Sequence, residues 1–172
     1  MSEEKTDQAP IFIRTVSKED LETVQRVLKD TWHHTYDPLH GKDKIGMLVD
    51  TMFDLESLQE RRDQPHSEFI VADTGEQIVG VAFAAQLDRI VFLHQLYVLP
   101  SAQRQGVAKQ LLEELYYCFD SAEKMALEVD AKNKNAISFY EKQDFVKAGE
   151  TDNCAGTTNI PALVLEKPLQ IV

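Results

Sequence analysis

The chain has 172 residues, which is enough for one domain with a sizeable core and too few for two domains of ordinary size. Hydrophobic residues make up 43% and charged residues 27%, a composition typical of a folded globular protein and unlike that of a disordered chain. The 29 acidic residues outnumber the 18 basic ones, and the resulting net charge of −11 disfavours general binding to nucleic acid or to an anionic membrane.

The N-terminal end and the cysteines bear on the cellular location. Residues 1–10 are polar, which predicts a short disordered lead before a domain over residues 11–172, and no apolar run is long enough for a membrane span. Cys118 and Cys154 form no CxxC pair and lack the spacing of metal ligands. We therefore expect a reduced cytoplasmic protein with no metal site.

The first half of the chain alternates strand and helix patterns. A strand over 11–14 precedes Ser17 and Asp20, which resemble a capping box, and a helix from there is expected to end near Trp32. Between residues 32 and 62, Pro38 and Gly41 interrupt a weaker helical pattern, so two helices, or a helix and a loop, are both possible. Residues 68–72 and 78–87 around a turn at 73–76 then predict a hairpin.

The second half begins with a nearly continuous apolar strand over residues 90–98, a pattern typical of a strand covered on both faces. Further elements alternate after it: helices at 107–119 and 135–142, and strands at 125–129, 145–148 and 162–165. This order predicts a mixed α/β sheet.

The loop between the apolar strand and the helix at 107–119 has the properties of an anion site. A loop with a glycine at a tight position directs unpaired backbone N–H groups toward the positive end of the following helix. Arg104 and Lys109 lie between residues 101 and 112, where there is no acidic residue. This favours a phosphate ligand, although the loop is neither a Walker loop nor a dinucleotide fingerprint, and an ordinary strand-to-helix turn stays an alternative.

Two segments together resemble the GNAT superfamily of N-acetyltransferases. Gln103-Arg-Gln-Gly-Val-Ala108 resembles the Q/R-x-x-G-x-G/A pyrophosphate loop of that family, and Asn133-Lys-Asn-Ala-Ile-Ser-Phe-Tyr-Glu-Lys-Gln-Asp-Phe145 resembles its N-x-x-A-x-x-x-Y-E-K-x-G-F segment. Asp144 departs from the usual glycine. The resemblance implies a single domain with a mixed, mostly antiparallel sheet of about six or seven strands, flanked by helices on both faces.

The resemblance also implies acetyl-CoA as co-substrate. Residues along the strand, the loop and the second segment would bind it: Leu96, Tyr97, Val98, Gln103, Arg104, Gln105, Gly106, Val107, Ala108, Lys109, Asn133, Asn135, Tyr140 and Lys142.

Two side chains are candidates for proton transfer. Tyr140 would face the thioester sulfur, and a phenol with a pKa near 10 can protonate the leaving thiolate, so we interpret it as the general acid. His94 has an ordinary pKa near 6.5, which suits a general base, and strand alternation puts it on the same side as Leu96. A satisfied core histidine is the alternative for His94, with a water or another acid as the base.

The acceptor is expected to be a primary amine that attacks the thioester directly. Trp32 and Tyr36, after the first helix, are candidates for the acceptor pocket, and the adjacent histidines, His33 and His34, are surface or core residues rather than metal ligands. The first 90 residues hold 18 acidic and 10 basic residues, which favours a cationic acceptor. The order Asp30-Thr-Trp with Thr35-Tyr36 resembles bacterial polyamine and small-amine acetyltransferases.

Several alternatives stay open. The sequence does not separate a polyamine-like acceptor from a protein or peptide amine, and transfer of a longer acyl group is a third alternative. The competing class is a non-catalytic acyl-CoA sensor, which needs the phosphate loop but has no need of Tyr140. A homodimer through the late strands is implied by the resemblance alone.

Overall fold

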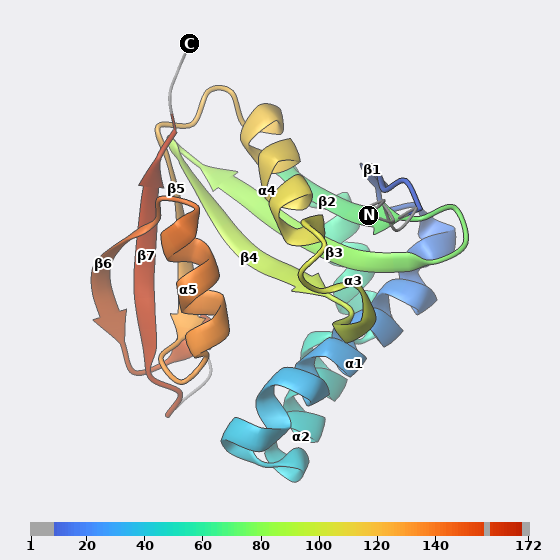
Figure 1. Cartoon of the computed structure of the whole chain (residues 1–172), viewed down its shortest axis with the longest axis horizontal. Coiled ribbons are helices and arrows are strands. Elements are labelled where there is room, and N and C mark those ends of the chain that lie inside the picture. The colour runs from blue at the N-terminus through green and yellow to red at the C-terminus, as the bar shows by residue number, and fades with distance from the viewer. Residues whose placement is uncertain (1–8, 157–158, 170–172) are drawn as a thin grey trace, which may run out of the picture.

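A computed structural model describes residues 9–156 and 159–169, so most of the predicted disordered lead, residues 1–8, lies outside the described residues. The chain forms one seven-stranded sheet with the order β1-β2-β3-β4-β5-β7-β6 (Figure 1). Neighbouring strands are antiparallel except β4 and β5. The strands are β1 (Phe12–Thr15), β2 (Ser67–Asp73), β3 (Ile78–Leu87), β4 (Ile90–Val98), β5 (Lys124–Asp130), β6 (Val146–Thr151) and β7 (Ala162–Pro168).

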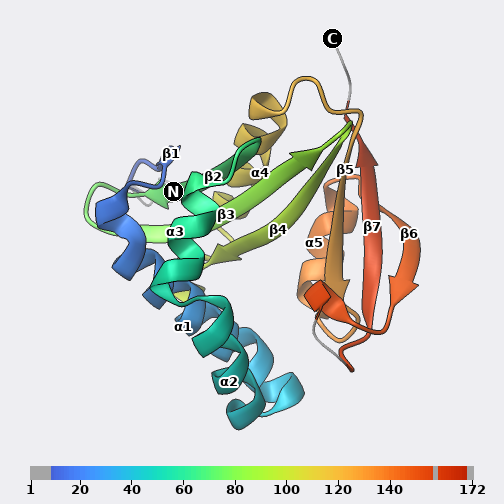
Figure 2. The same ribbon diagram turned by 180° about the vertical axis from the view of Figure 1, so that it is seen from behind.

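Helices cover both faces of the sheet, as predicted (Figures 1 and 2). One group packs on the face formed by β2, β3 and β4 and shares a core with Val71, Val81 and Phe83, whereas α4 packs on the opposite face of the same strands. The first group consists of α1 (Leu21–His40), α2 (Lys42–Met52) and α3 (Leu55–Asp63), and the other helices are α4 (Val107–Cys118) and α5 (Lys134–Lys142).

The first helical layer differs from the sequence prediction at one boundary. The capping box of Ser17 and Asp20 is present, but it opens a short 3₁₀ turn, Lys18–Asp20, that leads into α1. The predicted end of the helix near Trp32 is wrong, because α1 continues to His40 with Pro38 inside its last turns. A proline close to the C-terminal end removes a single intrahelical hydrogen bond, and the helix ends only where Gly41 takes a φ of +88°.

The weaker pattern after α1 resolves as the two further helices α2 and α3, one of the two possibilities left open by the sequence. The Asp54 side chain caps α3 by accepting from the Ser57 N–H at 2.7 Å. The hairpin of β2 and β3 and the strand β4 follow where they were predicted. One expectation for β4 is wrong: Phe92 and His94 are exposed, so the first half of the strand is covered on one face only.

The sheet is split between β4 and β5. The two strands pair in parallel only from Ile90 to Phe92, which oppose residues 124–126, and beyond that point β4 has partners on β3 alone. The two strands diverge from this closed end toward their C-terminal ends (Figure 1). Backbone groups of β4 that point toward β5 therefore have no ladder partner in the second half of the strand.

Among residues 9–156 and 159–169, no helix is both long and apolar enough to cross a membrane. Within the same residues, no group of three or more His, Cys, Asp or Glu side chains is arranged to hold a metal ion.

Candidate active site

The loop that enters α4 has the backbone geometry of an anion site. Arg104 and Gly106 both take left-handed conformations, with φ of +62° and +79°, and Gly106 is the N-cap of α4. An added Cβ on Gly106 would meet no atom within 4 Å, so the glycine is needed for its φ rather than for space. The first turn of α4 contains no acidic residue. Its unpaired N–H groups and the positive end of its dipole are suited to an anionic ligand.

The side chains of this loop divide into two kinds. Gln103 donates from Nε2 to the Val98 carbonyl at 3.0 Å, and Gln105 donates to the Ser101 carbonyl at 3.4 Å, so both hold the loop in shape. Arg104 is exposed and forms no ion pair with a described residue, and Lys109 has only a long contact of 3.8 Å with Glu113. The two cations are thus accessible at the site, while Val107 is buried in the core.

Tyr140 lies on α5, on the same side of the sheet as α4. Its side chain is buried, and its ring makes edge contacts with Phe139 at 5.3 Å and Phe145 at 5.5 Å between ring centres. Burial raises the pKa of Tyr140 well above its ordinary value of 10, and the nearby Tyr36 and Tyr116 add to this. The phenol therefore keeps its proton at neutral pH, which is the form a general acid requires.

The N-terminal end of α5 is fixed by Asn133. Its Oδ1 accepts from the Ala136 N–H at 3.2 Å as the helix cap, and its Nδ2 donates to the Tyr36 hydroxyl at 3.4 Å. Asn135 and Lys142 are exposed on α5. The structure thus assigns contacts to Asn133 and leaves the other two side chains accessible.

His94 does not lie where strand alternation put it. A β-bulge shifts the register between β3 and β4, so that Ala84 opposes Leu93 while Phe83 opposes Gln95, and His94 is left between the two pairs. Its ring stacks on Phe83 at 5.7 Å, on the side of the sheet where α1–α3 lie but at a position that these helices leave exposed, whereas Leu96 packs against the opposite core. The expectation that His94 and Leu96 share one side is wrong, because the extra residue of the bulge breaks the alternation.

The bulge also sets the electrostatic surroundings of His94. Partial desolvation lowers the pKa of His94 from its ordinary value of 6.5, the positive charge of Arg61 lowers it further, and Glu128 acts in the opposite direction. The imidazole is therefore neutral at pH 7, the form that accepts a proton.

The predicted acceptor residues Trp32 and Tyr36 lie within α1 rather than after it, and they belong to an aromatic cluster. The Trp32 ring lies 4.7 Å from Tyr36, 5.5 Å from Phe53 and 6.0 Å from Tyr97, measured between ring centres. Tyr97 was predicted from the resemblance as a cofactor residue, but its side chain packs in this cluster on the α1 side of β4. His33 pairs within α1 with Asp37 at 2.8 Å, as expected for a surface residue.

Polar atoms without partners gather around the same cluster. Trp32 Nε1, Arg61 Nη1 and Gln95 Oε1 are buried and have no hydrogen-bond partner among the described residues. Arg61 lies over the Phe53 ring, and Gln95 opposes Phe83, so all three belong to the α1–α3 side of the sheet. Unpartnered buried polar atoms of this kind are uncommon and mark a place where a polar ligand can be recognised.

Sequence reasoning missed four polar residues on this side: His40, Arg61, Glu128 and Asp130. In β5 the core residues Met125, Leu127 and Val129 alternate with positions 126, 128 and 130, so the pattern in the sequence already places Glu128 and Asp130 on one face. Asp130 is buried and bonds to His40 at the end of α1. That contact joins residues far apart in the sequence, so no local sequence pattern could have predicted it.

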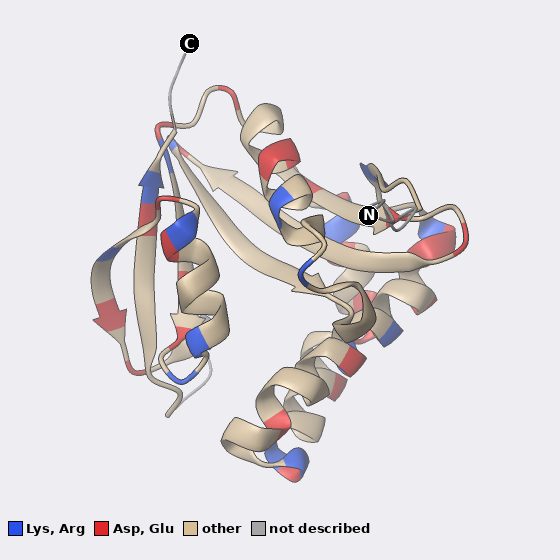
Figure 3. Ribbon diagram, viewed as in Figure 1, with Lys and Arg blue, Asp and Glu red and all other residues tan. Residues whose placement is uncertain are grey.

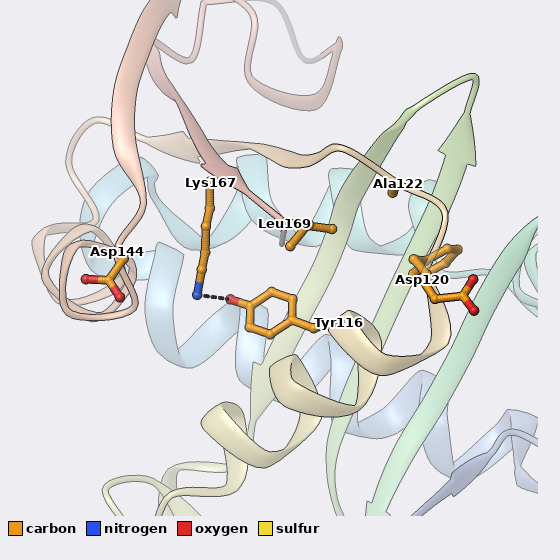
Figure 4. Close-up of a pocket in the computed structure, with 7 residues that line it drawn as sticks. Tyr116, Asp120, Ala122, Asp144, Lys167 and Leu169 are labelled. Atoms are coloured by element: carbon orange, nitrogen blue, oxygen red, sulfur yellow. Dashed lines mark hydrogen bonds between the residues drawn. The ribbon is translucent and has the colours of Figure 1, made fainter. Parts of the chain in front are cut away.

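A separate hollow of about 340 Å³ lies at the other end of α4 (Figure 4). The Lys167 Nζ sits 4.4 Å from the centre of the Tyr116 ring and donates to its hydroxyl at 3.4 Å. Asp120 and Asp144 lie at its margin (Figure 4). None of the predicted site residues lines this hollow, so it is distinct from the candidate active site.

Comparison with known proteins gives a family and a fold. The family model described as an acetyltransferase (GNAT) domain matches residues 37–162. A spermidine N(1)-acetyltransferase of Thermoplasma acidophilum is 28% identical in an alignment of 155 residues that covers 83% of this chain and 91% of that protein.

Solved structures share the fold. The PaiA N-acetyltransferase of Thermoplasma acidophilum in complex with coenzyme A superimposes with a TM-score of 0.81 at 23% identity, covering 92% of this chain and 99% of that one. The ribosomal-protein-S18-alanine N-acetyltransferase of Escherichia coli gives 0.73 at 18% identity, covering 95% and 96%.

Proposed function

This chain belongs to the GNAT acetyltransferase family and is an acetyl-CoA-dependent N-acetyltransferase, and we propose that it acetylates a cationic primary amine by direct attack on the thioester. The observation that carries the proposal is the arrangement around the split sheet. The N-terminal end of α4 and the buried phenol of Tyr140 lie on one side of β4, while the aromatic cluster around Trp32 lies on the other.

For acetyl-CoA, the proposed binding groups follow from the geometry of the loop. The N–H groups from Arg104 to Lys109 hold the pyrophosphate, with the two exposed cations beside it. The unpaired edge of β4 at Leu96 and Val98 hydrogen-bonds the amides of the pantetheine arm, as a further strand would. Bound there, acetyl-CoA supplies an activated acetyl group.

Tyr140 is proposed as the acid that protonates the leaving sulfur. Its raised pKa keeps the proton on the phenol until negative charge develops on a sulfur beside it. A cysteine intermediate is disfavoured, because burial raises the pKa of the Cys154 thiol to about 12 and that of Cys118 to about 11. Both thiols stay protonated at neutral pH, which supports direct transfer to the amine.

His94 is proposed as the group that takes the proton from the amine. An ordinary primary ammonium has a pKa near 10.4, so presenting its neutral form at pH 7 costs roughly 4 to 5 kcal/mol. The His94 imidazole is neutral, accessible and on the α1–α3 side of β4, where Trp32 and Tyr36 are the proposed acceptor residues. Glu128 on the neighbouring strand is the comparison residue in any test of this role.

A cationic acceptor is supported by charge and by a relative. Acidic residues are spread over the helical layer of α1–α3 and around the β2–β3 turn rather than gathered in one patch (Figure 3). Glu128 and Asp130 face the acceptor side from β5, and Gln95 Oε1 can accept a hydrogen bond from an ammonium group. The similarity to a spermidine acetyltransferase supports a polyamine-like amine in particular.

The net charge of −11 supports a protein that does not bind nucleic acid, and the two free cysteines support a reducing cytoplasmic location. We also propose that residues 11–172 form a single domain and that the protein is a homodimer.

Release of free thiol from acetyl-CoA tests the proposal directly. The panel should contain spermidine, free lysine, a lysine peptide, a peptide with a free N-terminus and a neutral-tailed primary amine of the same length as spermidine. We expect the highest kcat/KM with spermidine and a decline in that rate with added salt, because screening weakens steering by the acidic surface. A preference for the neutral-tailed amine contradicts the cationic acceptor, and tight binding of acetyl-CoA without thiol release on any amine supports the sensor alternative.

A further inference from the structure

The open end of the split sheet is bridged by side chains of α1. β4 and β5 pair only at their first residues, so Asp130, the last residue of β5, lies at the end where the strands are apart. α1 packs on β3 and β4, on the other side of the split. The last turns of α1 nevertheless reach β5 and the start of α5 through Tyr36 and His40.

Two contacts make this bridge. The His40 Nε2 bonds the Asp130 Oδ2, and the side chains of both residues are at least nine-tenths buried. One turn earlier on α1, the Tyr36 hydroxyl accepts from the Asn133 Nδ2 at 3.4 Å. The ring centres of Tyr36 and His40 are 6.4 Å apart with their planes inclined by 29°, so the two contacts lie side by side.

Each partner on the β5 side also shapes the start of α5. The Asp130 Oδ1 accepts from the Lys132 N–H at 2.9 Å, and Asn133 caps α5. Burial of an acidic side chain is costly unless its oxygens are hydrogen-bonded, and here both Asp130 oxygens are engaged. The pair therefore fixes the turn from which α5, and with it Tyr140, extends.

We propose that His40 and Asp130 form a clasp that sets the spacing between the acceptor side of β4 and the helix carrying Tyr140. Both are positioning residues, and neither is placed at the reacting atoms. Together they hold the β4 half, which carries the proposed acceptor cluster, against the β5 half, which carries Tyr140. The loop at Arg104 to Lys109 belongs to the β4 half alone, whereas the predicted cofactor residues of α5 belong to the other half. The clasp should therefore affect the acceptor and the transfer step more strongly than it affects acetyl-CoA binding. This inference rests on the proposed roles of Tyr140 and the α1 cluster.

The test compares His40→Ala, Asp130→Ala and the double variant with wild type, using amide hydrogen exchange and steady-state kinetics. We expect faster exchange in the last turn of α1 and in residues 130–136, and a loss of about tenfold or more in acceptor kcat/KM. The dissociation constant of acetyl-CoA should change by a smaller factor than acceptor kcat/KM. The double variant should be no worse than either single one, because the two residues act as one unit.

His40→Gln is the rescue variant, since its amide N–H can still donate to Asp130, and it should recover most of the acceptor kcat/KM. His33→Gln is the matched control, because it breaks a histidine–carboxylate pair within the same helix that does not cross the split. If the alanine variants fail to fold, His40→Phe replaces them in the kinetic comparison, because its ring fills the buried site and cannot donate to Asp130.

Faster exchange with unchanged kinetics, equal losses in acceptor kcat/KM and acetyl-CoA affinity, or unchanged exchange would each overturn the clasp. A wild-type enzyme that acetylates no amine in the panel contradicts the proposed acceptor instead, and the exchange measurement still tests whether the clasp holds the two halves.

Discussion

The two sides of β4 are built in different ways. The proposed acetyl-CoA side depends on one short loop, in which the backbone of Gly106 and of the residues beside it would form the site. The proposed acceptor side depends on side chains from α1, α3, β4 and β5 that come together only in the folded chain. A local backbone site tolerates changes elsewhere in the chain, whereas a site assembled from four elements can be changed at each of them. Changes on one side should therefore leave the other side's binding constant intact.

The largest expected effect is at Tyr140, the proposed proton donor on the α4 side of the sheet. Tyr140→Phe removes the proton donor and keeps the ring that packs on Phe139 and Phe145. We expect kcat to fall by at least about tenfold with little change in the dissociation constant of acetyl-CoA, measured by thiol release and calorimetry. Tyr117→Phe, on the exposed face of α4, is the control and should leave both unchanged. Undiminished turnover in Tyr140→Phe removes the phenol from the mechanism.

The next effect is on the loop. Gly106→Ala puts a side chain at a φ of +79°, which costs about 1 kcal/mol or more and favours a different loop conformation. We expect the dissociation constant of acetyl-CoA to rise roughly fivefold or more, while kcat at saturating acetyl-CoA changes little. Gly75→Ala is the matched control, since Gly75 has a φ of +89° and equally open surroundings in the β2–β3 turn. Equal loss of acetyl-CoA affinity in both variants contradicts a specific role for the loop.

The same contrast between local and assembled features separates what the sequence predicted correctly from what it did not. The helix periods, the hairpin and the loop before α4 depend on neighbouring residues, and these elements were confirmed within a few residues. The errors arose where distant parts decide the outcome. α1 passes Trp32 because its final turns are held against β5 by His40, and His94 changes face because β3 imposes a bulge on β4. Arg61 and Asp130 are ordinary charged residues in the sequence and become part of the acceptor side only through the tertiary fold.

The role of His94 can be separated from its packing by a pH profile. The lowered pKa of His94 keeps the base form present below its ordinary value of 6.5, so the acid limb of kcat/KM should lie below that pH in the wild type. His94→Gln should lower kcat/KM by several-fold and remove this limb. Glu128→Gln in parallel shows whether a limb that survives belongs to the carboxylate. A profile unchanged in His94→Gln assigns the proton to another group.

The smallest effect on activity is expected at the start of α1, which touches neither site. Asp20 accepts from Arg14 at 2.7 Å and from the Ser17 N–H, and these bonds, with the Arg14 charge, lower its pKa from 3.8 to about 2. A carboxyl whose pKa is lower in the folded state contributes stability that is fully present above about pH 4 and is lost as the pH falls toward 2. Asp20→Asn should therefore cost about 1 kcal/mol at pH 7, after allowance for solvent screening by the partly exposed Arg14, and progressively less below pH 4. Urea unfolding across this pH range measures the difference, and kcat/KM at pH 7 should match that of the wild type. A stability loss that stays constant down to pH 2 would show that the aspartate acts through its shape rather than its charge.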